Sequence, residues 1–271
     1  MKNINESEVV LEEAPLVSCQ FSWNRAYGYS ACDYCFFPLE TAEQNIRRLT
    51  FNNAITLLYP EVDKTQEVLQ NIVECSECQT KFCSSKCLEE AEKKYHKVLC
   101  LGIPANCGFE EINEAWKKMH YPPETCSVML VLRILAMIKT NPDLLSVFSE
   151  FCDRSVNDDE VIIHKMLGEK FVSQLRELHL MVASVFCEDL VLSKYLEFEG
   201  FVSLFALIGT NSQGIGTSSF AAWVSAVSDL DLENDAQKKE LDEFIDFAYN
   251  TLDESKIKQQ ICFNCILIRL F

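Results

Sequence analysis

Glycine, proline and long apolar runs are scarce in this sequence. Only 8 of the 271 residues are Gly and 7 are Pro, which excludes a collagen-like or low-complexity chain. The longest nearly uninterrupted apolar run, residues 126–138, contains Arg133 and is shorter than the roughly 18–20 residues of a bilayer span. It predicts a buried helix, and we expect no membrane association. The 48% of hydrophobic residues is enough for one large core or two modest ones.

Basic residues are also scarce. The chain has 24 Lys and Arg against 41 Asp and Glu, which gives a formal net charge of -17. Such a charge repels phosphate backbones over most of the surface. We therefore expect no direct nucleic-acid binding, and basic protein partners are favoured. The acidic N-terminus has no apolar segment of the length that a secretory signal needs, so we expect a cytoplasmic or nuclear protein, or one found in both. In a reducing compartment, clustered cysteines indicate metal before disulfides.

The chain divides by composition into three stretches. Residues 8–21 read as a strand with an irregular approach. Residues 32–100 are rich in cysteine and hold little that could form a continuous hydrophobic face, which favours a small module organised by metal. Helical periodicity begins near Glu110 and is interrupted by a polar, glycine-bearing segment, 209–217, which we expect to be a loop. The expected helices lie near 124–140, 142–152, 158–180, 182–195 and 234–253.

Seven of the fourteen cysteines fall in residues 32–100, and their spacing is typical of metal ligands. The order is C-x2-C, then 39 residues, then C-x2-C-x4-C-x3-C-x8-H-x3-C. Seven thiols and one imidazole make two tetrahedral sets, as structural zinc requires, whereas ordinary buried thiols rarely occur in four such pairs. Each C-x2-C pair can bind from a tight turn, and each x3 pair is expected on one helical face. The eight candidate ligands are Cys32, Cys35, Cys75, Cys78, Cys83, Cys87, His96 and Cys100.

Spacing alone leaves open which pairs share a metal. A RING finger is disfavoured because it needs a His soon after the second pair and a C-x2-C at its end. The order of pairs resembles a MYND finger, including the steps Phe82-Cys83-Ser84 and Tyr95-His96. That resemblance implies one zinc on Cys32, Cys35, Cys83 and Cys87, and a second on Cys75, Cys78, His96 and Cys100.

The 39-residue insert and several further segments resemble the fifth-member branch of the SET-and-MYND family of protein-lysine methyltransferases. These segments are Arg25–Tyr27, Tyr95–Cys100, Glu114–Trp116, His120–Thr125, His164–Phe171, Ser203–Leu207 and Gly209–Ser219. The resemblance implies an α+β fold, in which a split SET domain carries an inserted MYND zinc finger and a mostly α-helical SET-I region. It also implies methyl transfer from S-adenosylmethionine to lysines of histones or other basic proteins.

Mapped onto the chain, the resemblance gives four regions. They are a SET strand remnant (1–31), the finger with its long insert (32–100), a helical SET-I-like region (101–255) and a divergent tail (256–271). The family's Gly-rich loop and its N-H-S-C and G-E-E-I segments do not occur in this sequence, so we expect a chain truncated at both ends of the SET domain, with no assignable catalytic residue. Asn211 is the candidate contact to the methyl donor, and capping a turn is its alternative role.

The tail contains a cysteine pair and an apolar end. Cys262 and Cys265 form one C-x2-C pair with no partner pair, so we expect no zinc site there. Residues 266–271 read as an exposed, β-rich segment without a partner strand. For the whole chain, the alternative to a methyltransferase is a non-catalytic, zinc-built interaction module that binds Pro-containing peptides.

Overall fold

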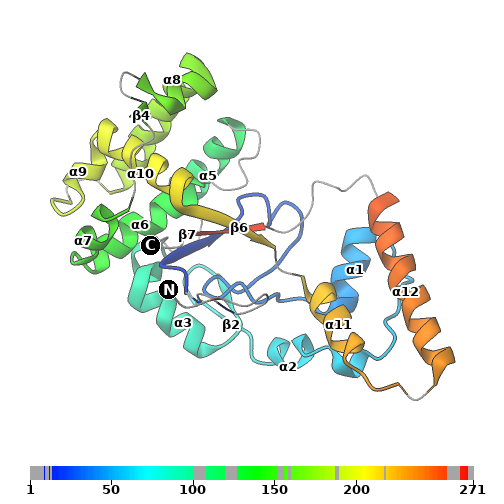
Figure 1. The fold of residues 1–271 in the computed structure, drawn as a ribbon. Helices are drawn as coiled ribbons and strands as arrows, with labels where there is room; N and C mark the ends of the chain where they lie inside the picture. Colours follow the sequence, from blue (N-terminus) through cyan, green and yellow to red (C-terminus); the bar gives the residue numbers. More distant parts are fainter. Residues whose placement is uncertain are drawn as a thin grey trace, which may run out of the picture.

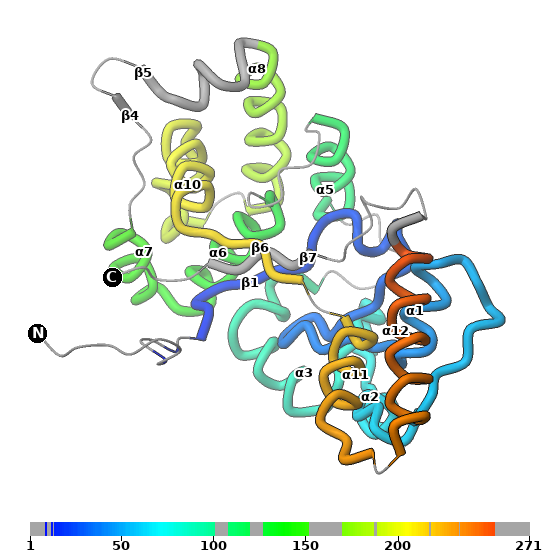
Figure 2. Tube along the Cα trace, turned by 45° about the vertical axis from the view of Figure 1, so that its right-hand side comes forward, coloured from blue at the N-terminus to red at the C-terminus, as the bar shows by residue number. Residues whose placement is uncertain are grey.

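A computed structural model describes Val9, Glu12 and residues 14–100, 108–119, 127–151, 156–157, 160–186, 189–216, 218–232, 234–254 and 263–267. These residues form a helix-rich α+β fold around a small sheet. Figure 1 shows one group of helices, α5 to α10, on one side of this sheet, while α1, α11 and α12 form a separate lobe on the other. In Figure 2 the cysteine-rich segment around α3 lies below the sheet, between these two parts.

The first helical group is built around α6 (Val128–Thr140), which carries the predicted buried run. Ten of its residues are buried, and the Ser127 hydroxyl caps its start by accepting the Met129 N–H at 3.2 Å. Within this group, three helices pack against α6, namely α5 (Gly108–Met119), α7 (Leu144–Ser149) and α10 (Phe198–Asn211). Further out, α8 (Ile162–Val185) packs against α5 and α10, and α9 (Ser193–Leu196) packs against α10 and α8. The prediction of a helix-rich second half is confirmed for the described residues.

One predicted helix boundary is wrong. We expected separate helices over 158–180 and 182–195, but α8 runs without a break to Val185. Its buried side chains Leu175, Leu178 and Val182 follow one another at spacings of three and four residues, so the same apolar stripe continues through position 181. With no Gly or Pro there, nothing ends the helix.

The sheet has three antiparallel strands in the order β1-β7-β6. Their bounds are β1 (Val17–Gln20), β6 (Ser212–Gly216) and β7 (Phe263–Leu267). The expected strand in 8–21 is thus present. Two predictions are wrong. Residues 266 and 267 of the tail have partners, because β7 pairs with strands on both sides, while residues 268–271 lie outside the described residues. Residues 209–216 are not a loop, because α10 continues to Asn211 and β6 follows at once, and residue 217 lies outside the described residues.

The long insert contains helix α1 (Ala42–Thr50), so the expectation that it lacks a hydrophobic face is also wrong. Thr41 and Gln44 form a capping box at its start. α1 packs with α11 (Ser219–Ser228) and α12 (Asp235–Glu254) in a second core around Ile46, Phe220 and Trp223. The short elements η1 (Pro60–Val62) and α2 (Thr65–Leu69) complete the insert. None of the described helices could cross a bilayer, given its length and polarity.

Candidate metal centre

The two C-x2-C pairs form turns of the same geometry. After each pair, one residue adopts left-handed backbone angles, Phe36 with φ of 60° and Gln79 with φ of 59°. The N–H of Phe36 donates to the Cys32 carbonyl at 3.0 Å, and that of Gln79 donates to the Cys75 carbonyl at 2.9 Å. Left-handed angles are uncommon outside Gly, so these matched turns indicate a geometry that the ligand pairs impose.

The first cluster joins Cys32 and Cys35 to two thiols at the start of α3 (Ser85–Ala91). Cys83 Sγ lies 3.6 Å from Cys35 Sγ and 3.4 Å from Cys87 Sγ. Ser84 caps the helix by accepting the Cys87 N–H at 3.3 Å. The expectation that both thiols of this pair share a helical face is therefore wrong for Cys83, because it precedes the cap and follows β3 (Lys81–Phe82).

The second cluster joins Cys75 and Cys78 to His96 and Cys100. The Cys75 and Cys100 sulfurs lie 3.7 Å apart, and Cys78 Sγ lies 3.6 Å from His96 Nε2. His96 ends a π-helical turn, η2 (Glu92–His96), and Cys100 follows the single turn α4 (Lys97–Leu99). Phe82 lies edge-on to the imidazole at 5.4 Å. The other two ligands, Cys75 and Cys78, lie in the turn that joins β2 (Val73–Glu74) to β3.

Both clusters fit tetrahedral zinc. Within each, all four ligand atoms lie within 4.8 Å of one another. Zn–S bonds of about 2.3 Å place two sulfurs of a tetrahedron about 3.8 Å apart, close to the separations of 3.4 to 3.7 Å seen here. The structure therefore brings together the same two sets of four residues that the MYND resemblance implies.

Contacts within the clusters shift the pKa values of several of the thiols. A hydrogen bond from the Cys35 thiol lowers the pKa of Cys32 to about 5 despite its burial. Burial and the Cys87 thiol raise the pKa of Cys83 to about 12. Burial opposes ionisation of Cys75, but hydrogen bonds led by that of His96 lower its pKa to about 6. Each cluster thus contains a thiol whose pKa lies below its usual value, Cys32 in the first and Cys75 in the second, and the thiolate is the form that binds metal.

A buried ion pair ties the first cluster to the helices and the sheet. Arg133 of α6 donates to the Asp33 carboxylate at 2.6 Å, to the Asp33 carbonyl at 3.1 Å and to the Ser18 carbonyl of β1 at 2.6 Å. Its guanidinium lies 4.3 Å from the centre of the Tyr95 ring, and the Tyr95 hydroxyl donates to Asp33 at 3.1 Å. Burial opposes the Arg133 charge, but Asp33 holds its pKa above the usual value.

Sequence reasoning missed this network, although one signal was present. Arg133 is the single charge within the apolar run 126–138, and a buried cation needs a partner. The partner could not be named, because Asp33 lies 100 residues away, between two expected zinc ligands.

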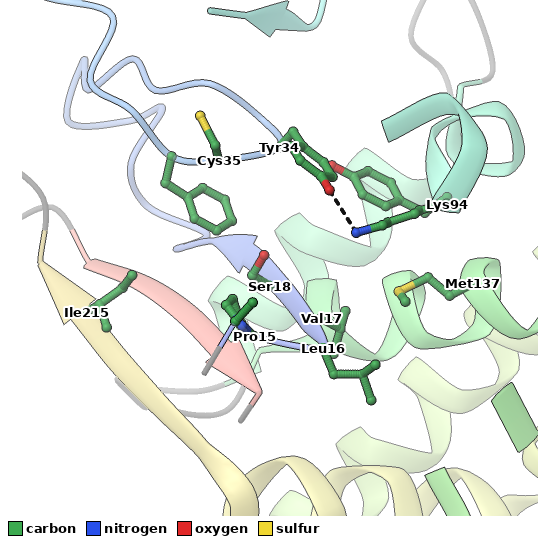
Figure 3. Close-up of a pocket in the computed structure, with 12 residues that line it drawn as sticks. Pro15, Leu16, Val17, Ser18, Tyr34, Cys35, Lys94, Met137 and Ile215 are labelled. Carbon is green, nitrogen blue, oxygen red and sulfur yellow. Dashed lines mark hydrogen bonds between the residues drawn. The ribbon is translucent and has the colours of Figure 1, made fainter. Parts of the chain in front are cut away.

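A cavity of about 390 Å³ lies beside the first cluster (Figure 3). Tyr34 and Lys94 form its side on the finger, and the Lys94 ammonium donates to the Tyr34 hydroxyl at 2.7 Å. Met137 of α6 and Ile215 of β6 lie on two other sides, with β1 between them. The finger, the sheet and the first helical group therefore meet at this cavity.

Asn211 lies at the end of α10 and is buried, with 7% of its surface exposed. Its amide donates to the Leu207 carbonyl at 2.8 Å, one turn back in the same helix. Capping a turn is the alternative role expected for Asn211, but no turn follows it, because β6 begins at the next residue. Cys265 pairs with Cys19 and Gly214 in the sheet, and Cys262 lies outside the described residues.

A helix-rich fold with a small sheet and two Cys/His clusters is consistent with the SET-and-MYND family, and the chain belongs to that family, in its fifth-member branch. It is 43% identical to proteins named protein-lysine N-trimethyltransferase SMYD5 from Gallus gallus and Danio rerio, over 93% of this chain, and 41% identical to that of Homo sapiens over 92%. The chain spans 60–61% of the length of these relatives. No family model and no solved structure matches it.

Proposed function

We propose that this chain acts in protein-lysine N-methylation and contributes the zinc-built finger and the helical region around it. The pairing of ligands into two four-residue clusters carries the proposal, and the names of the relatives support it. In this proposal each cluster holds one structural zinc. The helices α5–α10 correspond to the SET-I region, and the sheet corresponds to part of a split SET domain.

S-adenosylmethionine would supply the methyl group, and the acceptor would be a neutral lysine amine of a histone or another basic protein. The chain's own charge of -17 supports a basic substrate, and the metal-ligand spacing of its clustered cysteines supports a reducing compartment, the cytoplasm or the nucleus. Asn211 is our candidate for a contact to the methyl donor. Besides the N–H that donates to Leu207, the Asn211 amide carries a second N–H and a carbonyl oxygen that can take part in such a contact.

The second candidate function is a non-catalytic interaction module for Pro-containing peptides. The observation that favours it is a groove of about 670 Å³ on the finger, beside β2 and the start of α3. Val73 and Ile72 line it together with Ser84 and Ser85. An open, partly apolar groove next to a short strand suits an extended peptide.

Two measurements on the purified full chain test these functions in order. Elemental analysis should give two zinc ions per chain, and Cys35→Ser and Cys78→Ser should each remove one of them. Calorimetric titration with S-adenosylhomocysteine should then give saturable binding, weakened in Asn211→Ala. A flat titration from a folded chain with two zinc ions would favour the interaction module, and less than one zinc per chain would refute both.

A further inference from the structure

A second groove also borders the first cluster, and it shares Cys35 and Phe36 with the cavity of Figure 3. Its volume is about 820 Å³, and all the residues that line it belong to the described part of the chain. They come from three separate stretches: the first C-x2-C turn, the insert near η1, and helix α11. The branch-specific insert therefore forms one wall of this groove.

The two long walls of the groove differ in shape. Along α11, the side chains that line it are small, with Ala222, Ser225 and Ala226 on one face of the helix. The first C-x2-C turn contributes Phe36, Phe37 and Pro38 to the lining. A wall of small side chains lets a ligand backbone approach closely, while a wall of rings offers apolar area to a ligand side chain.

The frame of the groove is held by specific bonds. Trp223 is buried in the second core, and its indole N–H donates to the Tyr59 carbonyl at 3.3 Å. Asp63 accepts the N–H of Ala42 at 2.8 Å and the N–H of Thr65 at 3.0 Å. These bonds hold the segment around η1 against α1 and α11.

The charge around the groove is negative. Asp229 is exposed at the C-terminal end of α11, and Lys64 is the only basic side chain that lines the groove. The segment 229–254, which begins at this end, contains ten Asp and Glu and two Lys. At the other end lies Cys35, an exposed member of the first cluster, where four thiolates around one zinc leave a formal charge of about -2.

We propose that this groove docks a basic, extended segment of a protein substrate, with one apolar side chain of that segment between the rings and α11 and a Lys or Arg at Asp229. The choice of a substrate as the occupant rests on the proposed function. Charge complementarity selects a basic partner over a second copy of this chain, because two chains of charge -17 repel each other. The groove would hold substrate outside the cavity of Figure 3.

The experiment measures fluorescence anisotropy of labelled peptides of about 12 residues with the zinc-loaded full chain. The first peptide carries four Lys or Arg around a central Leu. In the second, Glu replaces the basic residues, and in the third, Ser replaces the Leu. Ala222→Trp fills the groove and Asp229→Lys reverses the charge at its end. Ala221→Trp is the matched control, because Ala221 is an exposed neighbour on the same helix that does not line the groove.

We expect the first peptide to bind at least about tenfold more tightly than the other two, which corresponds to about 1.4 kcal/mol. Ala222→Trp and Asp229→Lys should each weaken its binding by about tenfold or more, with Ala221→Trp within about twofold of the unmodified chain. Zinc content and thermal melts of all the variants verify that they fold.

Three results would overturn the proposal: equal binding of the acidic peptide, unchanged binding in Ala222→Trp, or equal losses in Ala221→Trp and Ala222→Trp. A dimer in sedimentation that Ala222→Trp disrupts would also overturn it, because the occupant would then be a second copy. Binding requires no methyl donor. A chain that binds the peptide but gives a flat titration with S-adenosylhomocysteine would therefore count against the proposed function and not against the groove.

Discussion

Replacing Arg133 by Met should destabilise the chain far more than an ordinary loss of charge on the same helix. The Arg133 side chain is 6% exposed and that of Asp33 is 20% exposed, so the substitution leaves a largely buried carboxylate without its cation. It also removes the donors to the carbonyls of Ser18 and Asp33. Removing one partner of a buried ion pair costs about 3–5 kcal/mol. Since Asp33 keeps some contact with water, we expect about 3 kcal/mol.

The measurement is urea unfolding of the zinc-loaded chain, followed by circular dichroism. Lys139→Met is the matched control, because Lys139 lies on the same helix and pairs with Asp189 at 3.2 Å while 43% of its side chain is exposed. That exposed pair should contribute about 0–1 kcal/mol. In the Arg133→Met background, Asp33→Asn should recover at least about 1 kcal/mol, because it removes the unpaired charge. Equal losses for Arg133→Met and Lys139→Met, or no recovery, would refute the reasoning.

Three further predictions follow from particular contacts. Gly200→Ala should cost about 2 kcal/mol or more in urea unfolding, because an added Cβ would clash with the backbone carbonyl of Lys194. Gly209→Ala should gain about 0.5–1 kcal/mol, because Gly209 is a helical position with open space around it; a loss at Gly209 would contradict the helix there. Asn45→Ala should lower the free energy of unfolding by about 1–3 kcal/mol, because it removes the acceptor for the Ser218 hydroxyl and the donor to Glu40. A neutral effect in the same assay would disprove the link between the insert and α11. Burial raises the pKa of Tyr95 above its usual value. The stabilisation of the fold by the neutral Tyr95 hydroxyl is therefore complete below about pH 10 and is lost as the pH rises further. Tyr95→Phe should flatten this decline in unfolding free energy, and parallel curves of unfolding free energy against pH for the two proteins would argue against this role of Tyr95.

The ligands of the candidate metal centre could be predicted from the sequence because their spacing is local. A C-x2-C pair needs only one turn, and the same turn occurs twice, with Phe36 and Gln79 in matching left-handed conformations. The buried helix around Arg133 was predictable for the same reason, since its apolar run is continuous. These features depend on residues close together in the sequence, so no knowledge of distant contacts is needed to predict them.

The features that the sequence did not reveal depend on partners far apart in the chain. Asn45 of the insert accepts a hydrogen bond from Ser218, which lies 173 residues away, so the face of α1 could not be recognised from the insert alone. The segment after Gly209 has the composition of a loop, yet β7 offers it a full ladder from Ser212 to Gly216. Tertiary pairing thus overrides the preference of a glycine-bearing segment for a turn.

The two candidate zinc sites differ in what each would hold together. The ligands of the second cluster all lie between Cys75 and Cys100, so a metal there closes only the finger itself. The first cluster joins Cys35 to Cys83 across 48 positions, and the insert lies within that loop. A metal that closes a long loop removes more conformational freedom from the unfolded chain than one that closes a short loop. Because Asp33 of the same turn is fixed by Arg133, the first zinc would connect the insert lobe, the finger and the first helical group, and its loss would affect all three.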